Sequence, residues 1–193
     1  MKLFFISDIH GSLSSLNAAL KCFHAERADQ IVILGDALYH GPRNPLPDGY
    51  NPAETAQLLN QYKDRIIAVR GNCDSEVDQM LIEYPMMETY GILQLADRKF
   101  FLTHGHVYHP DDHPPLLAGD ILAFGHIHLP LAEKRGEIFV FNPGSISLPK
   151  ENNPPSYGLF DGGKLQVKTL DGEVLREVAV GEQPARTAPR PPA

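Results

Sequence analysis

The stretch KLFFISDIHGSLSSLNAALKCFHAERADQIVILGD, residues 2–36, decides the fold of this chain. It reads as a short apolar strand over residues 2–7, a helix with apolar spacing over 13–26, and a second buried strand over 30–35. This order is a βαβ unit. The pattern continues with a Pro- and Gly-rich loop, a helix over 53–62 and a strand over 65–71. We therefore predict parallel strands whose carboxyl ends open onto one crevice.

The second half of the chain has a different pattern. After a helix around 75–82 it shows short strands separated by turn signals, and then three strands joined by Gly- and Asp-containing turns, which indicate an antiparallel meander. We expect this half to form another sheet packed on the first, with helices outside. The predicted strands of this half are 90–95, 99–104, 120–126, 137–142, 156–161, 164–170 and 173–180.

Bulk properties narrow the class of protein. A chain of 193 residues with 42% hydrophobic content suits one domain, which we place at 1–180, followed by a Pro-rich tail at 181–193 that we expect to be disordered. The net charge of −7 argues against binding to long nucleic acids. The apolar run at the N-terminus is too short for a signal peptide, no stretch is long enough for a membrane span, and two cysteines make no disulfide framework. We expect a cytoplasmic protein.

Polar residues with metal-binding side chains follow five apolar segments. In an extended chain, residues i and i+2 lie on the same side, roughly 6.5 to 7 Å apart, so Asp8 with His10, and His126 with His128, can each face one cavity. Each dipeptide alone is more often a turn or a helix cap. Turns alone, however, do not explain such groups at five successive strand ends. The candidate ligands are Asp8, His10, Asp36, Asn72, His104, His126 and His128.

The types of ligand indicate the metal chemistry. Carboxylate, amide and imidazole groups without thiolate favour borderline to hard divalent ions such as Mn, Fe, Zn or Co. One ion that keeps an open position needs fewer ligands than these, so two ions sharing one carboxylate fit better than one. Two ions roughly 3.5 to 4 Å apart can activate water and hold the attacking and leaving oxygens of a displacement at phosphorus.

In order, these residues form the pattern D-x-H, G-D, G-N-C-D, H and G-H-x-H over about residues 1–150. This pattern resembles the calcineurin-like metallophosphoesterases and, through the GNCDSEVDQM, YHGPRNPLP and FNPGS segments, the bacterial YfcE-type phosphodiesterases. The resemblance implies a four-layer αββα sandwich of two mixed sheets flanked by helices. It implies two divalent ions bridged by Asp36, with Mn²⁺ the expected metal and Zn²⁺, Fe²⁺, Co²⁺ or Ni²⁺ as alternatives. One ion would bind Asp8, His10 and His128, and the other Asn72, His104 and His126.

Cys73 stands where the family pattern has a histidine. In the family that histidine stabilises the transition state or protonates the leaving group, whereas a thiol is a weak donor. We therefore expect a preference for leaving groups that need little protonation. Cys73 could act as a nucleophile, but no base is evident beside it in the sequence. It could also bind a metal, as a ligand in addition to the seven candidates above. A partly buried filler is the favoured interpretation.

Other polar residues are candidates for lesser roles. His40 and Arg43 lie in the loop after Asp36 and are candidates for binding substrate phosphate, with a solvated loop as the alternative. Asp74 is expected to orient a ligand or to cap the next helix, and we group it with Asp36, Asn72 and Cys73 as the candidate catalytic residues. Residues 142–145 form a turn that either lies against the site from the second sheet or has no part in it.

The sequence thus predicts a metal-dependent phosphodiesterase in which a metal-bridging hydroxide attacks a small phosphodiester. A phosphomonoesterase or nucleotide hydrolase on the same two metals is one alternative. The other is a protein-binding scaffold like the retromer subunit that shares this fold. We expect no long nucleic acid and no membrane as a partner, and a homo-oligomer, either a dimer or a tetramer, is compatible with a chain of this size.

Overall fold

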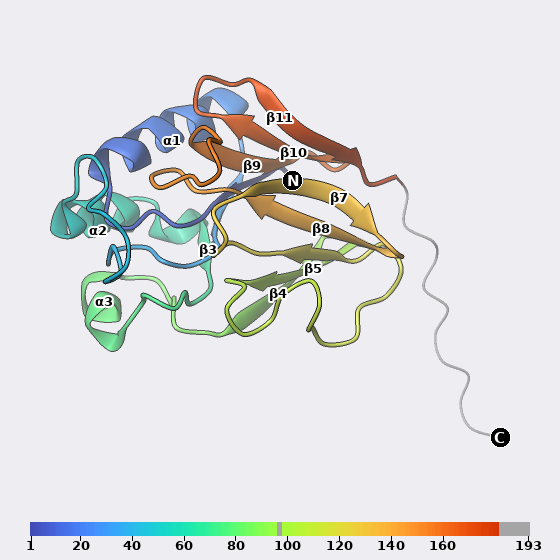
Figure 1. The fold of residues 1–193 in the computed structure, drawn as a ribbon, viewed down its shortest axis with the longest axis horizontal. Helices are drawn as coiled ribbons and strands as arrows, with labels where there is room; N and C mark the ends of the chain where they lie inside the picture. The colour runs from blue at the N-terminus through green and yellow to red at the C-terminus, as the bar shows by residue number, and fades with distance from the viewer. Residues whose placement is uncertain (96–97, 182–193) are drawn as a thin grey trace.

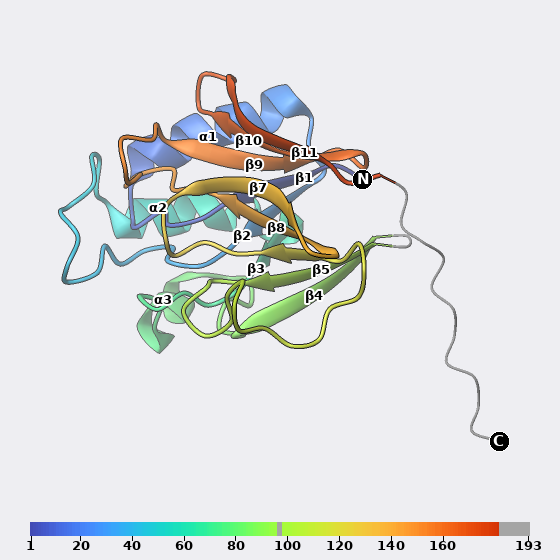
Figure 2. The same ribbon diagram turned by 45° about the vertical axis from the view of Figure 1, so that its right-hand side comes forward.

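The computed structural model describes residues 1–95 and 98–181. Two β-sheets pack face to face, and the helices cover the outer face of the first sheet (Figures 1 and 2). The expected disordered tail lies outside the described residues from residue 182 onward. In the described part of the chain, no helix is both long and apolar enough to cross a membrane.

The first sheet has six strands in the order β11-β10-β9-β1-β2-β3. β1 pairs in parallel with β2, and β2 with β3, as the βαβ pattern predicts. The expected meander of β9, β10 and β11 is antiparallel, but the prediction that it belongs to the second sheet is wrong, because β9 pairs with the free edge of β1. The strands are β1 (Leu3–Ile6), β2 (Gln30–Ile33), β3 (Ile66–Ala68), β9 (Ser156–Phe160), β10 (Lys164–Thr169) and β11 (Val174–Ala179).

The second sheet has five strands in the order β4-β5-β6-β8-β7. β5, β6 and β8 run in parallel, and the edge strands β4 and β7 are antiparallel to their neighbours. The edge strand β7, which begins at Pro130 and ends at Arg135, is not among the predicted strands. Its first residue, Pro130, is compatible with a strand start at the edge of a sheet. The strands are β4 (Tyr90–Leu95), β5 (Arg98–Thr103), β6 (Ile121–Ala123), β7 (Pro130–Arg135) and β8 (Ile138–Pro143).

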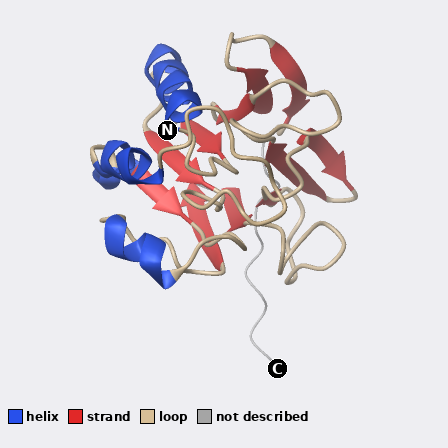
Figure 3. Ribbon diagram, turned by 60° about the vertical axis from the view of Figure 1, so that its left-hand side comes forward, coloured by secondary structure: helices blue, strands red, loops and turns tan. Residues whose placement is uncertain are grey.

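The helices are α1 (Leu13–Glu26), α2 (Pro52–Asn60), α3 (Glu76–Leu81) and the short 3₁₀ helix η1 (Lys63–Arg65). α1 begins where predicted because the Ser12 hydroxyl accepts a hydrogen bond from the Ser15 backbone N–H. Two packed mixed sheets with helices against them confirm the expected α/β sandwich, but in the part of the chain that the structure describes only one of its two outer layers is built of α-helices (Figure 3). Among the described residues, the three α-helices all lie on one side of the molecule, against the first sheet (Figure 3).

The central strand β1 contributes side chains to two hydrophobic cores. Phe4 and Ile6 face the helices, whereas Leu3 and Phe5 face the second sheet. The Phe5 ring packs on Phe141 at 5.2 Å between centroids and on Phe100 at 6.0 Å. β1 is therefore buried on both faces, which holds its carboxyl end in a fixed position.

Replacing Phe5 tests how far the packing of the two sheets stabilises the fold. Phe5→Ala is expected to lower the free energy of unfolding by about 3–5 kcal/mol, because it leaves a cavity among buried rings. Urea unfolding followed by circular dichroism measures this loss. The control Ile92→Ala, on a side chain that is 61% exposed, should change stability by less than about 0.5 kcal/mol. A loss below about 1 kcal/mol for Phe5→Ala would contradict this account of the core.

Candidate metal centre

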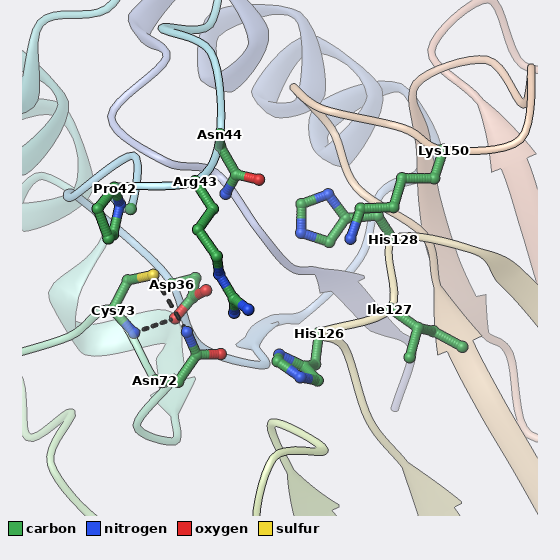
Figure 4. A pocket seen from close by; sticks show the side chains of 11 residues that line it. Asp36, Pro42, Arg43, Asn44, Asn72, Cys73, His126, Ile127, His128 and Lys150 are labelled. Atoms are coloured by element: carbon green, nitrogen blue, oxygen red, sulfur yellow. Dashed lines mark hydrogen bonds between the residues drawn. The ribbon is translucent and has the colours of Figure 1, made fainter.

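The candidate ligands lie just after strands that run in parallel. Asp8 follows β1, Asp36 follows β2, and Asn72 follows β3 in the first sheet. In the second sheet His104 follows β5, and His126 and His128 follow β6. The carboxyl ends of parallel strands meet at one edge, so residues far apart in the sequence surround one cavity. Figure 4 shows several of these side chains around it.

The backbone at these strand ends is strained. Most residues with side chains avoid positive φ, and a side chain held there costs on the order of 1–3 kcal/mol. Five candidate ligands nevertheless have φ between 48° and 67°. These are Asp8, His10, Asp36, His126 and His128. Strain of this kind persists where the surrounding structure fixes the side chain in place, and it concentrates at functional sites.

Two glycines of the motifs allow loops to approach the ligands closely. A Cβ on Gly71 would lie 2.0 Å from Asp36 Oδ1, and a Cβ on Gly125 would lie 1.9 Å from the Ser7 hydroxyl. Neither neighbour can move away, since Asp36 and Ser7 are buried. Gly71, before Asn72, is thus required by close contact between two loops of the first sheet, and Gly125, before His126, by close contact between a loop of the second sheet and Ser7 of the first.

The carboxylates and imidazoles form two adjoining clusters. In the first, His128 Nε2 lies 3.2 Å and His10 Nε2 3.8 Å from Asp8 Oδ1. In the second, His104 Nε2 lies 3.4 Å from Asp36 Oδ2 and 3.0 Å from Asn72 Oδ1. His10 Nε2 is also 3.8 Å from Asp36 Oδ2, so Asp36 lies between the clusters. Ligand atoms of Asp8, His10 and His128, and likewise of Asp8, Asp36 and His104, lie within 4.8 Å of one another.

Three of the histidines are oriented by backbone carbonyl groups. The Nδ1 atoms of His10, His104 and His128 lie 2.8, 2.6 and 2.5 Å from the carbonyl oxygens of Tyr39, Leu34 and Leu148. A donated Nδ1–H fixes the tautomer, so that Nε2 carries the lone pair and faces the cavity. This is the usual arrangement of histidines that bind metals.

Two polar atoms at the centre have no hydrogen-bond partner in the part of the chain that the structure describes. Asp8 Oδ1 and His10 Nε2 are buried and accept or donate no hydrogen bond among the described residues. Burial would raise the pKa of Asp36, but His104 lowers it below the usual range, and Asp36 in turn raises the pKa of His104 to about 9 against the effect of burial. Buried carboxylates that draw a proton onto His104 in this way fit a divalent cation, which would take the place of that proton.

The two remaining candidate ligands are less enclosed. His126 is half-buried, its backbone N–H donates to Asp8 Oδ2 at 3.1 Å, and its ring centroid is 5.0 Å from that of His104. Asn72 is exposed and lies beside His104. Both line a cavity of about 570 Å³, which the structure forms over Asp36 (Figure 4). All seven predicted ligands are thus brought to one place.

A model of the calcineurin-like phosphoesterase superfamily domain matches residues 1–164. The chain belongs to this superfamily. It is 52% identical over 181 residues to phosphodiesterase YfcE of Escherichia coli strain K12, covering 93% of this chain and 98% of that protein. A solved structure of YfcE from E. coli, 51% identical, has a TM-score of 0.92 and covers 94% of this chain and all of that one.

A more distant structure, that of Vps29 complexed with Zn²⁺ from Entamoeba histolytica, is 21% identical with a TM-score of 0.59 and covers 94% of this chain and 100% of that one. At this identity only the fold is shared. The matches at 52% and 51% identity confirm the expected resemblance to the YfcE type and the expected enzyme class, a phosphoric diester hydrolase.

In this phosphoesterase, Cys73 lies at the cavity over Asp36, and its thiol forms a hydrogen bond with the Asp36 carboxylate (Figure 4). Its backbone N–H donates to Asp36 Oδ1 at 2.8 Å, and its thiol is half-buried beside that carboxylate. Burial and the negative charge of Asp36 raise the pKa of Cys73 to about 12. Without a metal the residue is therefore a neutral thiol, which argues against a thiolate nucleophile. Its sulfur lies within 4.8 Å of ligand atoms of His10 and Asp36, so the filler and the added metal ligand both stay predictions.

Asp74 connects the loops that follow β2 and β3. Its Oδ2 accepts the backbone N–H groups of Asp36 at 2.8 Å and Gly71 at 2.7 Å, and its Oδ1 accepts that of Ala37 at 2.8 Å. Ser75, not Asp74, caps α3. Of the two predicted roles, orienting a ligand is thus the one that the structure favours. Burial, and the charge of Asp36, raise the pKa of Asp74 to about 6.

The turn at 142–145 lies against the site. The hydroxyl groups of Ser145 and Ser147 donate to the Asp8 carbonyl at 2.8 and 2.9 Å, which fixes the strained backbone there. Sequence reasoning missed Ser147 and also Lys150, which lines the cavity opposite Arg43 (Figure 4). Of the two predicted substrate-binding residues, Arg43 lines the cavity, whereas His40 does not and lies beside Tyr50 instead. No local pattern marks Lys150, because it stands in a loop.

The hydrogen bonds from backbone N–H groups to Asp74 predict that this residue affects the affinity for Mn²⁺. Asp74→Asn places an amide NH₂ where one oxygen accepts backbone N–H groups, so Asp36 loses its fixed position. We expect Mn²⁺ affinity, measured by isothermal titration calorimetry, to fall about 10- to 100-fold. The control Asp78→Asn removes a neighbouring carboxylate that accepts from Ser75 only, and should leave the affinity within about twofold. Equal losses in both variants would contradict the role given to Asp74.

Proposed function

We propose that this protein is a metal-dependent phosphodiesterase that hydrolyses a small phosphodiester at a centre of two divalent ions, with Mn²⁺ the expected metal. The observation that carries the proposal is the set of three histidines whose Nε2 atoms are turned toward two buried carboxylates by backbone carbonyl groups. The 52% identity to phosphodiesterase YfcE supports the choice of a diester.

The proposed ligands divide between the two clusters. Asp8, His10 and His128 would hold one ion, and Asn72, His104 and His126 the other, with Asp36 shared between them. When bound, such ions supply an activated water at neutral pH and stabilise negative charge on phosphate oxygens. Ser145 and Ser147 hold Asp8 in place, and Asp74 holds Asp36.

Two cations of the chain face the substrate. Arg43 and Lys150 line opposite sides of the cavity over Asp36, and neither side chain forms an ion pair within the described residues. A planar guanidinium can bind two phosphate oxygens at once. We assign Arg43, with Lys150, to binding the anionic phosphate, while Asp36 and the other ligands fix where the reacting bond lies.

A panel of aryl phosphates tests the reaction class. Hydrolysis of bis(p-nitrophenyl) phosphate and of the monoester p-nitrophenyl phosphate is measured with Mn, Ni, Co, Zn and Mg. With Mn²⁺ the wild type should hydrolyse the diester, and should hydrolyse the monoester more slowly. Changes to residues that only support metal ligands lower metal affinity or activity by about 10- to 100-fold. Asp36→Asn changes a proposed ligand itself and should therefore lower kcat/KM by more than about 100-fold. Faster hydrolysis of the monoester would favour the phosphomonoesterase alternative, and a fully active Asp36→Asn would refute the two-metal centre.

The thiol at position 73 predicts a leaving-group preference. Without an effective proton donor, the enzyme should cleave aryl diesters far faster than alkyl diesters. General acid catalysis contributes about 10²–10⁴-fold, so Cys73→His should raise the rate on a methyl diester by about 100-fold relative to an aryl diester. Cys73→Ala should keep most of the aryl activity. Comparable wild-type rates on alkyl and aryl diesters would show that the preference does not exist.

The scaffold alternative has weaker support. Its fold-level likeness, at 21% identity, carries no function, and in this chain all seven proposed ligand positions are occupied by metal-binding side chains. We also propose that residues 1–180 act as one domain, because β1 and β9 from opposite ends of the chain pair in one sheet. A cytoplasmic location, supported by two free cysteines, and a homo-oligomeric state remain predictions.

A further inference from the structure

A second cavity adjoins the metal centre. It has a volume of about 740 Å³ and lies beyond Cys73, toward α3. Four residues line both this cavity and the one over Asp36, so the two meet at the metal centre. The shared residues are Pro42, Arg43, Asn72 and Cys73. A phosphodiester has two ester arms, and two cavities that meet at the reacting phosphorus give each arm its own place.

The second cavity presents positive charge. Arg70 lines it, and the Arg70 Nε donates to the Asp74 carbonyl at 3.2 Å, which orients the guanidinium. The two terminal nitrogens of Arg70 have no hydrogen-bond or ion-pair partner among the described residues, and the same is true of the guanidinium of Arg43. A protein of net charge −7 thus has two arginines lining one cavity with no ion pair to a carboxylate among the described residues.

The two acidic residues that line this cavity, Asp74 and Asp78, are almost fully buried. Both oxygens of Asp74 accept backbone N–H groups, and the Asp74 side chain is buried. Asp78 accepts from the Ser75 backbone and hydroxyl within the first turn of α3, and is 9% exposed. The rest of the lining includes Tyr39, 41% exposed, and Val77, 66% exposed. The accessible surface is therefore cationic with an aromatic and apolar part.

We infer that the cavity beyond Cys73 binds one ester arm of the substrate and selects an arm that carries a second anionic group, carboxylate or phosphoryl, through Arg70, while Arg43, which lines both cavities, stays with the reacting phosphate. This inference rests on the proposed phosphodiesterase function and narrows its substrate class. A fixed guanidinium with free terminal nitrogens binds carboxylate and phosphoryl groups in the same bidentate way. Tyr39 and Val77 contact the apolar part of the same arm.

A matched pair of symmetric diesters tests this selection. Bis(3-carboxy-4-nitrophenyl) phosphate and its bis-carboxamide analogue differ in charge and hardly in shape, and symmetry places the test group in the cavity whichever arm enters it. With each rate normalised to alkaline hydrolysis, the wild type with Mn²⁺ should prefer the carboxylate diester by at least about fivefold in kcat/KM. This preference should decline as salt is added, because exposed charges are screened.

The deciding variant is Arg70→Met, in which the preference should fall to about one. The preference is a ratio of two kcat/KM values, so a general loss of activity does not alter it. Arg70→Gln, which keeps a neutral hydrogen-bond donor, gives a second measurement of the same ratio. Lys21→Met removes the same charge from the surface of α1 and should keep the wild-type ratio. A wild-type ratio near one, or an unchanged ratio in the Arg70 variants, overturns the inference and leaves the phosphodiesterase standing. If neither diester is cleaved, the proposed function fails, and this inference fails with it.

Discussion

The rest of the site depends on the hydrogen bonds that the Asp74 carboxylate accepts from three backbone N–H groups. This carboxylate joins the loop after β2 to the loop after β3 at the point where Asp36 must lie between the two histidine clusters. Gly71 lets these loops approach so closely that no side chain would fit there. Asp36 is therefore placed by backbone geometry, and its partners His10 and His104 are placed by carbonyl groups of neighbouring segments.

Packing of the two sheets maintains this geometry. Left-handed backbone at five proposed ligands costs free energy, and that cost is offset by β1, which is buried between two cores and cannot shift without disrupting both. The second sheet supplies His104, His126 and His128, and the turn after β8 returns to the Asp8 carbonyl through Ser145 and Ser147. The site is thus built at the edge between the sheets, and neither sheet alone would form it.

Most of the site could be predicted from the sequence, because its ligands occur in ordered motifs directly after apolar strands. The β1–α1–β2 unit and the meander were predictable for the same reason, since their periodicities are local. Pairing of β9 with β1 was not, because a strand pattern does not say which edge it joins. Strand β7 was not predictable either, because its sequence does not alternate between apolar and polar residues. Lys150 and Arg70 come to line the cavities only because loops that follow different strands meet in the fold. His40 follows Asp36 closely in the sequence but lies beside Tyr50 and outside the cavity over Asp36.

Cys73 stands where the family pattern has a histidine and lines both cavities, and the full set of proposed metal ligands is present beside it. The central claim is that the strand ends of both sheets hold two ions with Asp36 between them. Crystals grown with Mn²⁺ and measured at the manganese absorption edge test it directly. The account predicts two anomalous peaks, one against Asp8, His10 and His128 and the other against Asn72, His104 and His126, both contacting Asp36. A single peak, or peaks away from Asp36, would contradict it.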